Sequence, residues 1–229
     1  MGGDRASDRA AMLAEQLEGR GITDQRVLEA MGSVPRESFV PESEQRHAYA
    51  DRALTIGAGQ TISQPWIVAA ICQALELDGT ESVLEVGTGS GYSAAVLAQL
   101  ATRVTSIERI EELVVAARAR LAALELDASI EIRIGDGSLG DVPGGPFEAI
   151  AVHAAVPQPP AALLAQLAPG GRLVAPVATG GEEILTRFRR RPGARAADPA
   201  SFSREPLVSC RFVPLIGEQA YPPPPGEPG

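Results

Sequence analysis

Cysteine and histidine are scarce in this chain of 229 residues, which has only two of each. Cys72 and Cys210 lie far apart, and each sits in an apolar stretch, so we expect two buried free thiols. Structural zinc sites need cysteine and histidine clustered at short spacing, and the sequence has no such cluster. We therefore expect no metal site.

Long apolar runs and basic clusters are missing as well. No apolar run approaches the ~20 residues of a membrane span, and residues 1–9 lack the apolar core of a signal peptide. There are 20 basic and 29 acidic residues, giving a net charge of −9, which opposes binding to a phosphate backbone. We therefore expect a cytoplasmic protein with no membrane partner and no nucleic-acid partner.

Apolar residues make up 45% of the chain, so a sizeable core can form within one structural domain. We expect three parts: an N-terminal helical extension over residues 1–79 that packs on the core, the core itself over 80–217, and a proline-rich tail over 218–229. The glycine-containing stretch 57–65 is predicted to be a loop. Helices are expected in the N-terminal part over residues 10–17, 24–31 and 66–77.

The core alternates short apolar strands with helices. The strands are predicted over residues 82–86, 103–107, 130–134, 147–152 and 172–177, and the helices over 92–100, 110–124 and 161–167. This alternation predicts an α/β fold with a mostly parallel sheet and helices on both faces. Two further strands, over 184–190 and 208–214, follow each other without a helix and predict antiparallel C-terminal edge strands.

A glycine-rich turn, Glu85-Val-Gly-Thr-Gly-Ser-Gly-Tyr92, joins a predicted strand to a predicted helix. Glycines let a ligand approach the backbone, and the start of a helix offers free N–H groups. A dinucleotide fingerprint G-x-G-x-x-G beginning at Gly87 would need glycine at position 92, where Tyr92 stands. The G-x-G-x-G spacing instead resembles the first motif of Rossmann-like methyltransferases.

Acidic residues follow the next two predicted strands. Glu108 comes directly after the predicted strand over 103–107, where a carboxylate can bind both hydroxyls of a ribose. NAD enzymes share this feature. Asp136-Gly137 follows the strand over 130–134, where Asp136 would accept a hydrogen bond from an adenine amino group. An ordinary Asp-Gly turn is the alternative interpretation of that pair.

The stretch Gly57-Ala-Gly-Gln-Thr-Ile-Ser-Gln-Pro65 resembles the signature of the protein-L-isoaspartate O-methyltransferases. Other segments similar to that family follow in the same order, over about residues 13–217. They are Arg20-Gly-Ile22, Val34-Pro-Arg-Glu-Ser-Phe-Val-Pro41, Ala48-Tyr-Ala-Asp51, Val83 to Tyr92, Gly135-Asp-Gly137, Gln166-Leu-Ala-Pro-Gly-Gly171 and Arg211-Phe-Val-Pro-Leu215.

The resemblance implies a Rossmann-like methyltransferase fold and a reaction. Such enzymes transfer the methyl group of S-adenosyl-L-methionine, releasing S-adenosyl-L-homocysteine, to the free carboxylate of L-isoaspartyl residues in damaged proteins. The ester recloses to a succinimide, and hydrolysis returns some normal aspartate. The partners would be isoaspartyl proteins and peptides, and we expect a monomer.

The resemblance also implies site residues. Ser63 would be the catalytic-site residue, donating its hydroxyl to a carboxylate oxygen, although by composition alone a loop or N-cap serine is the simpler interpretation. Val213, Pro214 and Leu215 would help to close the peptide groove. The cofactor-binding residues would be Ile56, Gly57, Gly59, Gln60, Glu85, Gly87, Thr88, Gly89, Gly91, Glu108, Arg109, Asp136 and Gly137.

The chain departs from the family pattern at three positions. Thr55 stands where proline is usual, Ala178 replaces a usual glycine, and His153 occupies a position where a small or hydroxyl residue is common. His153 follows a predicted strand end, so it would either face the ligand crevice or be a partly buried structural histidine. These changes bear on substrate preference and not on methyl transfer.

Three other functions compete with repair. A related enzyme methylates an aspartate side chain in a dedicated ribosomal peptide, and such relatives often carry an additional C-terminal domain. A cofactor-sensing or damaged-peptide-binding module without turnover is opposed by the intact motif residues. A nucleic-acid methyltransferase is opposed by the net charge of −9.

Overall fold

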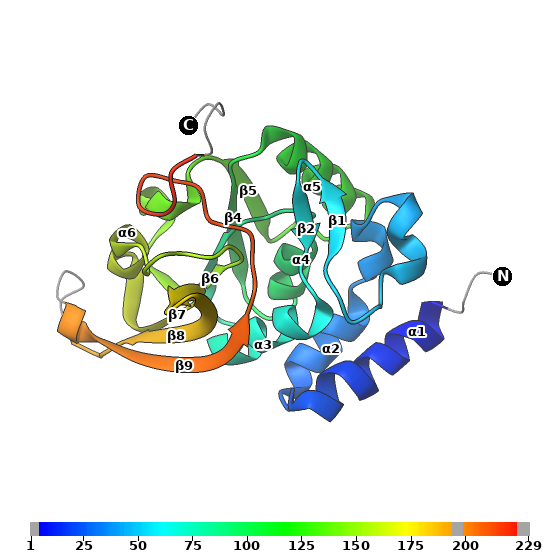
Figure 1. Ribbon diagram of the computed structural model, residues 1–229, viewed down its shortest axis with the longest axis horizontal. Helices are drawn as coiled ribbons and strands as arrows, with labels where there is room; N and C mark the ends of the chain where they lie inside the picture. The colour runs from blue at the N-terminus through cyan, green and yellow to red at the C-terminus, as the bar shows by residue number, and fades with distance from the viewer. Residues whose placement is uncertain (1–4, 194–198, 224–229) are drawn as a thin grey trace.

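A seven-stranded sheet runs through the centre of the computed structural model, which describes residues 5–193 and 199–223 (Figure 1). The strand order is β5-β4-β3-β6-β7-β8-β9. The strands span Ser82–Val86 (β3), Arg103–Glu108 (β4), Ile130–Ile134 (β5), Phe147–Val152 (β6), Leu167–Thr179 (β7), Glu182–Arg190 (β8) and Phe202–Cys210 (β9).

Strands β3 to β7 pair in parallel, and β8 and β9 extend the β7 edge in antiparallel pairs. The chain runs outward from β3 through β4 to β5, then returns to pair β6 with the other side of β3. The strand order therefore reverses between β3 and β6, and open α/β sheets bind ligands outside the carboxyl ends of their strands at such a point. The predicted fold class, including its antiparallel C-terminal strands, is confirmed.

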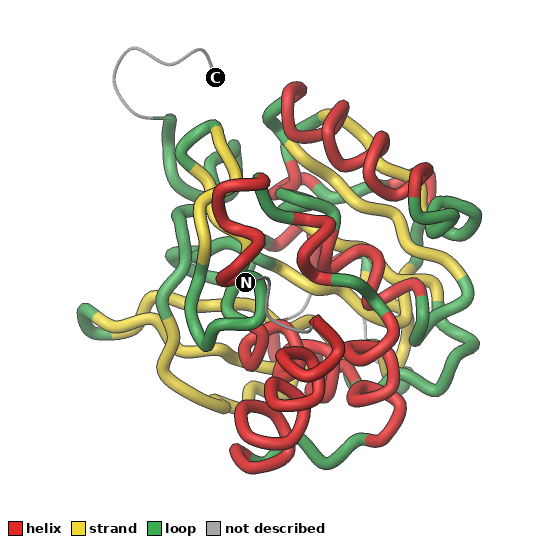
Figure 2. Tube along the Cα trace, turned by 90° about the vertical axis from the view of Figure 1, so that its right-hand side faces the viewer, coloured by secondary structure: helices red, strands yellow, loops and turns green. Residues whose placement is uncertain are grey.

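Each face of the sheet carries its own apolar cluster, because successive strand residues point to opposite faces. Val83 and Ala149 pack with α3 (Pro65–Leu75), α4 (Tyr92–Ala98) and α5 (Glu111–Ala123). Leu84 and Ile150 face the other cluster, which includes residues of α6 (Ala161–Ala165) and of the C-terminal segment. In the side view, helices lie against the strands of the sheet (Figure 2).

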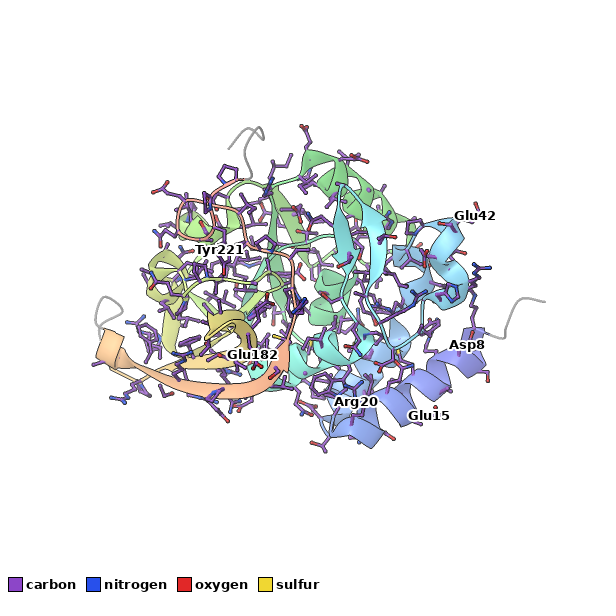
Figure 3. All side chains as sticks on the ribbon, in the orientation of Figure 1. Asp8, Glu15, Arg20, Glu42, Glu182 and Tyr221 are labelled. Carbon is purple, nitrogen blue, oxygen red and sulfur yellow. The ribbon has the colours of Figure 1, made fainter. Side chains whose placement is uncertain are left out.

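The N-terminal part packs on the same face as α3. It contains α1 (Arg5–Ala11), helical turns over Met12–Leu17 and Glu18–Arg20, α2 (Gln25–Ser33), and 3-10 turns over Arg36–Phe39 and Glu42–His47. Met12 and Met31 belong to the apolar cluster that contains Val83. Charged side chains such as Glu15 and Glu42 project outward (Figure 3). The division of the chain at residue 79 stays a prediction.

A tight turn over residues 78–81 leads from α3 into β3. The buried Glu81 carboxylate accepts backbone N–H groups of Asp78, Gly79 and Thr80 at 3.0–3.2 Å. Asp78 in turn accepts the N–H of Thr80 at 3.0 Å and its hydroxyl at 2.7 Å. These bonds satisfy the amides at the turn and fix the point where β3 begins.

Three local predictions were wrong. The predicted loop over 57–65 contains a hairpin of β1 (Leu54–Gly57) and β2 (Gln60–Ile62), whose turn places Ala58 at φ 48 and Gly59 at φ 68. The predicted strand over 208–214 was misplaced, because β9 begins at Phe202 and ends at Cys210. Strand β9 lies at the open edge of the sheet, where a proline such as Pro206 is tolerated within a strand. On that edge Cys210 is only half-buried, whereas Cys72 is buried as predicted.

The segment after β9 crosses the carboxyl ends of the parallel strands. Ala155 donates its N–H to Val213 and accepts the N–H of Leu215, each at 2.8 Å. Glu218 N–H reaches the Asp136 carboxylate at 2.7 Å, so this part of the predicted tail is docked on the core. Residues 224–229 of that tail lie outside the described residues. Within the described ranges, no helix has the length and apolar character needed to cross a membrane.

Candidate active site

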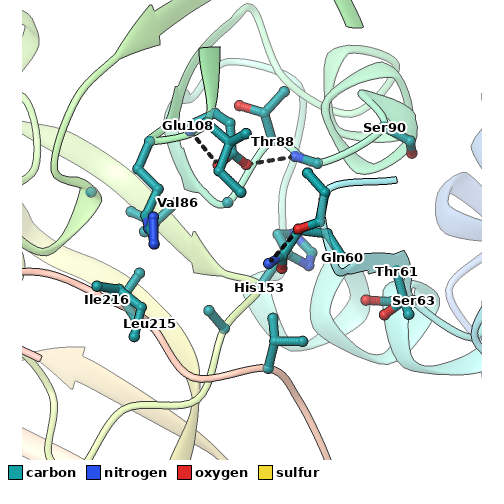
Figure 4. A pocket seen from close by; sticks show the side chains of 18 of the residues that line it. Gln60, Thr61, Ser63, Val86, Thr88, Ser90, Glu108, His153, Leu215 and Ile216 are labelled. Atoms are coloured by element: carbon teal, nitrogen blue, oxygen red, sulfur yellow. Dashed lines mark hydrogen bonds between the residues drawn. The ribbon is translucent and has the colours of Figure 1, made fainter. Parts of the chain in front are cut away.

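A cavity of about 430 Å³ opens at the carboxyl ends of β3, β4 and β6, where the strand order reverses (Figure 4). The β1–β2 hairpin and the glycine-rich turn form two of its walls. The C-terminal segment, from Val213 to Ile216, closes another side. Its volume is in the range of small-molecule sites.

The glycine-rich turn lies directly after β3. Gly87 has φ 94, which favours glycine, and its N–H donates to Ile107 at 2.9 Å, so the turn is tied to β4. Gly91 also has a positive φ, but it faces α5: a Cβ there would lie 3.2 Å from the Ala117 Cβ. The turn therefore presents Gly87, Thr88 and Gly89 to the cavity, and Gly91 lets α4 pack against α5.

Glu108 ends β4 on the cavity wall. Its carboxylate accepts the N–H of Gly89 at 3.0 Å and the N–H of Ile110 at 3.1 Å. A carboxylate has about four lone-pair positions, so these two bonds orient the group and leave acceptor capacity for a ligand. Apolar side chains of Ile107 and Ile110 line the cavity beside it.

A buried polar cluster borders the cavity: Thr88 and His153 line it, and Glu85 and Ser106 lie behind them. Ser106 donates to the Glu85 carboxyl at 2.5 Å, and the Ser106 and Thr88 hydroxyls are 2.5 Å apart. The His153 Nε2 atom is 3.5 Å from Glu85 Oε1. Burial raises the pKa of Glu85 from 4.5 to about 8 and lowers the pKa of His153 from 6.5 to about 4. At neutral pH the acid is therefore mostly protonated and the imidazole is neutral.

Replacing Glu85 with glutamine should make protein stability less sensitive to rising pH. Because the folded-state pKa of Glu85 is raised, its contribution to the free energy of unfolding is present at low pH and is lost as pH rises through about 8. Between about pH 5.5 and 8 this loss is on the order of 2–3 kcal/mol, which the isosteric glutamine should abolish. Denaturant unfolding of both proteins across this range measures the difference, and parallel curves would refute the assignment. His153, whose pKa is lowered, changes stability with pH in the opposite direction, but it does so in both proteins and cancels when their unfolding free energies are compared.

Ser63 lies between β2 and α3, half-buried on the cavity wall. Its carbonyl accepts a hydrogen bond at 2.6 Å from the fully buried Arg36 guanidinium, which also donates to the Ala48 carbonyl at 2.7 Å. The guanidinium lies over the Tyr92 ring, 4.8 Å from its centroid. Arg36 therefore fixes the backbone that carries the Ser63 hydroxyl.

A second cavity, of about 700 Å³, adjoins the first and runs between α3 and the end of β9. The two cavities share four lining residues, which we call the neck: Thr61, Ser63, His153 and Val213. A molecule in the inner cavity and a second one in the outer cavity would meet at the neck.

The chain closely matches known proteins of one family. The family model described as protein-L-isoaspartate(D-aspartate) O-methyltransferase matches residues 8–220. The chain belongs to this family. It is 50% identical over 213 residues to the protein-L-isoaspartate O-methyltransferase of Trichlorobacter lovleyi, covering 93% of this chain and 95% of the relative. It is also 50% identical over 216 residues to protein-L-isoaspartate O-methyltransferase 1 of Rhodopseudomonas palustris, covering 94% and 86%.

Solved structures of this methyltransferase family have the same fold. One protein-L-isoaspartate O-methyltransferase aligns with a TM-score of 0.79 at 25% identity, covering 93% of this chain and 67% of that one. A Plasmodium falciparum structure, described as a protein-L-isoaspartate O-methyltransferase in complex with S-adenosyl-L-homocysteine, aligns with a TM-score of 0.75 at 24% identity, covering 92% and 99%. The family resemblance noted in the sequence, and the methyltransferase class it implies, are confirmed.

Nine of the residues that the family resemblance assigned to the site line the inner cavity: Gly59, Gln60, Ser63, Gly87, Thr88, Gly89, Glu108, Arg109 and Gly137. Five others are not among its lining residues: Ile56, Gly57, Glu85, Gly91 and Asp136. The Asp136 carboxylate accepts the N–H and hydroxyl of Ser138 at 2.9 and 2.7 Å and the N–H of Glu218. The binding roles of all these residues stay predictions.

Other lining residues had not been assigned to the cofactor. Ile107 and Ile110 could have been predicted as lining residues, because they lie close to Glu108 in the sequence. Pro214 and Leu215, predicted to close the peptide groove, line the inner cavity, and Val213 lines both cavities. Ile216 had no signal in the sequence, because only the path of the C-terminal segment brings it to the site.

Proposed function

We propose that the inner cavity holds S-adenosyl-L-methionine, that the outer cavity receives the polypeptide, and that methyl transfer takes place at the neck. The acceptor is the free α-carboxylate of an L-isoaspartyl residue in a damaged protein. The observation that carries this proposal is the meeting of two cavities at Thr61, Ser63, His153 and Val213. One reactant therefore does not have to pass through the binding space of the other.

The residues of the inner cavity suit an adenosyl ligand. Glu108 presents free acceptor capacity suited to the two hydroxyls of a ribose, and Ile107 and Ile110 offer apolar surface for a base. The Gly87-Thr88-Gly89 turn allows close approach of a ligand to the backbone. The bound cofactor would supply a methyl group activated by its sulfonium, leaving S-adenosyl-L-homocysteine. The Plasmodium falciparum structure, of the same fold, contains that product.

The chain's own residues need only orient the acceptor and exclude water. An α-carboxylate has a pKa near ~3.5 and is already ionised at neutral pH, so no general base is required. Ser63 would donate its hydroxyl to one carboxylate oxygen and fix the line of attack. Val213 and Leu215 cover the neck and inner cavity and would limit the access of water.

The product would be an α-methyl ester next to a backbone amide. The ester carbonyl is a better electrophile than a carboxylate and carries methoxide as a leaving group, so the amide nitrogen can close a succinimide and release methanol. Hydrolysis of the succinimide then returns a fraction of normal aspartyl residues. The chain thereby initiates repair of isoaspartyl proteins.

The remaining parts of the proposal concern partners and compartment. We place the chain in the cytoplasm as a monomer that binds isoaspartyl proteins and no nucleic acid or membrane. The net charge of −9 supports the exclusion of nucleic acid. The relatives carry the name of the repair enzyme, which does not favour a dedicated peptide substrate.

Methyl transfer from labelled S-adenosyl-L-methionine to two matched peptides tests the function. We expect base-labile methyl ester on a peptide with L-isoaspartate and none on the same peptide with L-aspartate. Ester on the aspartyl peptide, or on neither peptide while the cofactor still binds, would contradict general repair. Calorimetry with S-adenosyl-L-homocysteine supplies the binding control.

A further inference from the structure

His153 stands at the carboxyl end of β6, next to the glycine-rich turn that follows β3. Its backbone N–H donates to Val86 at 2.9 Å, so the residue is held by the parallel pairing of the two central strands. Its side chain is 5% exposed and belongs to the neck. In the close-up it lies between Leu215 and Ile216 on one side and Thr61 and Ser63 on the other (Figure 4).

Both ring nitrogens of His153 are buried without a hydrogen-bond partner. Buried polar atoms in folded proteins nearly always have partners, so a purely structural histidine would be expected to have at least one. Glu85 Oε1 lies 3.5 Å from Nε2, and it too is buried without a hydrogen-bond partner. This unpartnered polar pair, of which His153 lines the neck, points to a ligand group that completes it.

The protonation states decide what that ligand group is. A neutral imidazole carries one N–H and one acceptor nitrogen. Burial keeps the pKa of His153 low, at about 4, and the pKa of Glu85 high, at about 8. Protonated Glu85 is on the Nε2 side and is suited to donate to it, which leaves the ring proton on Nδ1 as a free donor. A carboxylate only accepts hydrogen bonds and is the complement of such a donor.

We propose that His153 is a substrate-binding residue, which donates its ring N–H to the α-carboxylate of the isoaspartyl residue while Ser63 donates to the other oxygen. The inference rests on the proposed function and deepens it, because it assigns a second anchor to the acceptor. Two donors from different walls of the neck fix both the position and the rotation of the carboxylate. A single donor would leave the group free to turn about one hydrogen bond.

Other charged or titratable side chains surround the ring. Glu85 and Glu108 lie on the side of the inner cavity, together with Arg109. Arg20, Arg211 and Cys210 line the outer cavity. Arg20 forms an ion pair with Asp51 at 2.9 Å, so Arg211 is the arginine that would favour an anionic acceptor at the neck. Glu85, at 3.5 Å, is the acidic partner of the ring.

Two substitutions separate hydrogen bonding from packing. His153→Leu removes the donor at similar volume, and we expect the KM for an isoaspartyl peptide to rise roughly tenfold to hundredfold, as for loss of a hydrogen bond to a charged group. The KM for S-adenosyl-L-methionine should stay within about twofold. His153→Gln restores an N–H donor and should recover most of the peptide affinity. His47→Gln, at the other histidine, is the matched control.

Some kinetic outcomes would overturn the proposal. Equal peptide KM values for wild type and His153→Leu would do so, and so would a rise in the KM for the cofactor alone. Failure of wild type to methylate the isoaspartyl peptide at all would instead overturn the function on which the proposal rests. If His153→Leu does not fold, the His153→Gln variant and the spectroscopic test below decide.

Nitrogen-15 NMR of the imidazole ring tests the contact directly. The His47→Gln variant leaves His153 as the single histidine, so its ring signals need no further assignment. With S-adenosyl-L-homocysteine bound to prevent turnover, an isoaspartyl peptide should shift the donor-nitrogen signal. The same peptide with an α-carboxamide should not shift it. A shift with S-adenosyl-L-homocysteine alone that the peptide leaves unchanged, or no shift at all, would refute the contact.

Discussion

Ser63→Ala should lower kcat for methyl transfer by about a hundredfold and leave the affinity for S-adenosyl-L-homocysteine nearly unchanged. Ser63 is the half-buried hydroxyl at the neck, and Arg36 holds its backbone through the Ser63 carbonyl. Without the hydroxyl, the acceptor carboxylate loses a fixed orientation, and displacement by ~1 Å at a reacting centre can cost a hundredfold in rate. Single-turnover kinetics with labelled cofactor measures the effect.

Two further variants make the Ser63 result specific. Ser63→Thr keeps a hydroxyl and should retain a substantial part of the rate. Ser203→Ala changes an exposed serine of β9 that lines neither cavity, and it should alter kcat less than about threefold, as for a substitution away from the reacting groups. Wild-type kcat for Ser63→Ala would remove Ser63 from the mechanism.

Arg36→Met should both destabilise the protein and slow methyl transfer. Arg36 is fully buried, and burial lowers its pKa; its described hydrogen bonds go to the carbonyls of Ala48 and Ser63. Methionine would leave both carbonyls without this donor, which should cost about 2–4 kcal/mol of unfolding free energy. The melting temperature should then fall by about 5–15 °C. Thermal unfolding measures this loss, and kcat is measured well below the new melting temperature.

The kcat of Arg36→Met distinguishes a positioning role of Arg36 from a purely stabilising one. If Arg36 positions Ser63, kcat falls even at temperatures where the variant is fully folded. Arg46→Met changes an exposed arginine of the same N-terminal part and should shift stability by less than about 0.5 kcal/mol. A destabilised Arg36→Met protein with wild-type kcat would show that Arg36 supports only the fold.

The sequence predicted the two central strands well because β3 and β6 are short, apolar and almost entirely buried. Strands β3, β5 and β6 have the predicted bounds, and the turn at Gly87 was predictable from its glycines. The β1–β2 hairpin was missed because its turn needs a positive φ at Ala58, a residue that gives no signal for that conformation. The position of β9 was wrong because edge strands tolerate proline and polar residues.

The candidate site was only partly predictable, because proximity in space comes from the path of the chain. Ser63 and Glu108 follow from motifs, and both line the inner cavity. His153 and Val213 meet Ser63 only after β6 has crossed to β3 and the C-terminal segment has crossed the strand ends. Asp136 was expected in the cavity but is not among its lining residues, and its carboxylate accepts hydrogen bonds from Ser138 and Glu218, so its binding role stays a prediction.

The turn over residues 78–81 has a consequence for the chemical ageing of the enzyme itself. The chain contains no asparagine, and only Asp78-Gly79 and Asp136-Gly137 are Asp-Gly sequences, the pair in which a succinimide closes with least hindrance. In the first, the Gly79 N–H is engaged by Glu81, and the hydrogen bonds from Thr80 lower the pKa of Asp78 and keep its carboxylate ionised. An ionised carboxylate is a poor electrophile, and an engaged amide is a poor nucleophile. At Asp78-Gly79 the chain is therefore slow to acquire the kind of damage that the proposed reaction repairs in other proteins.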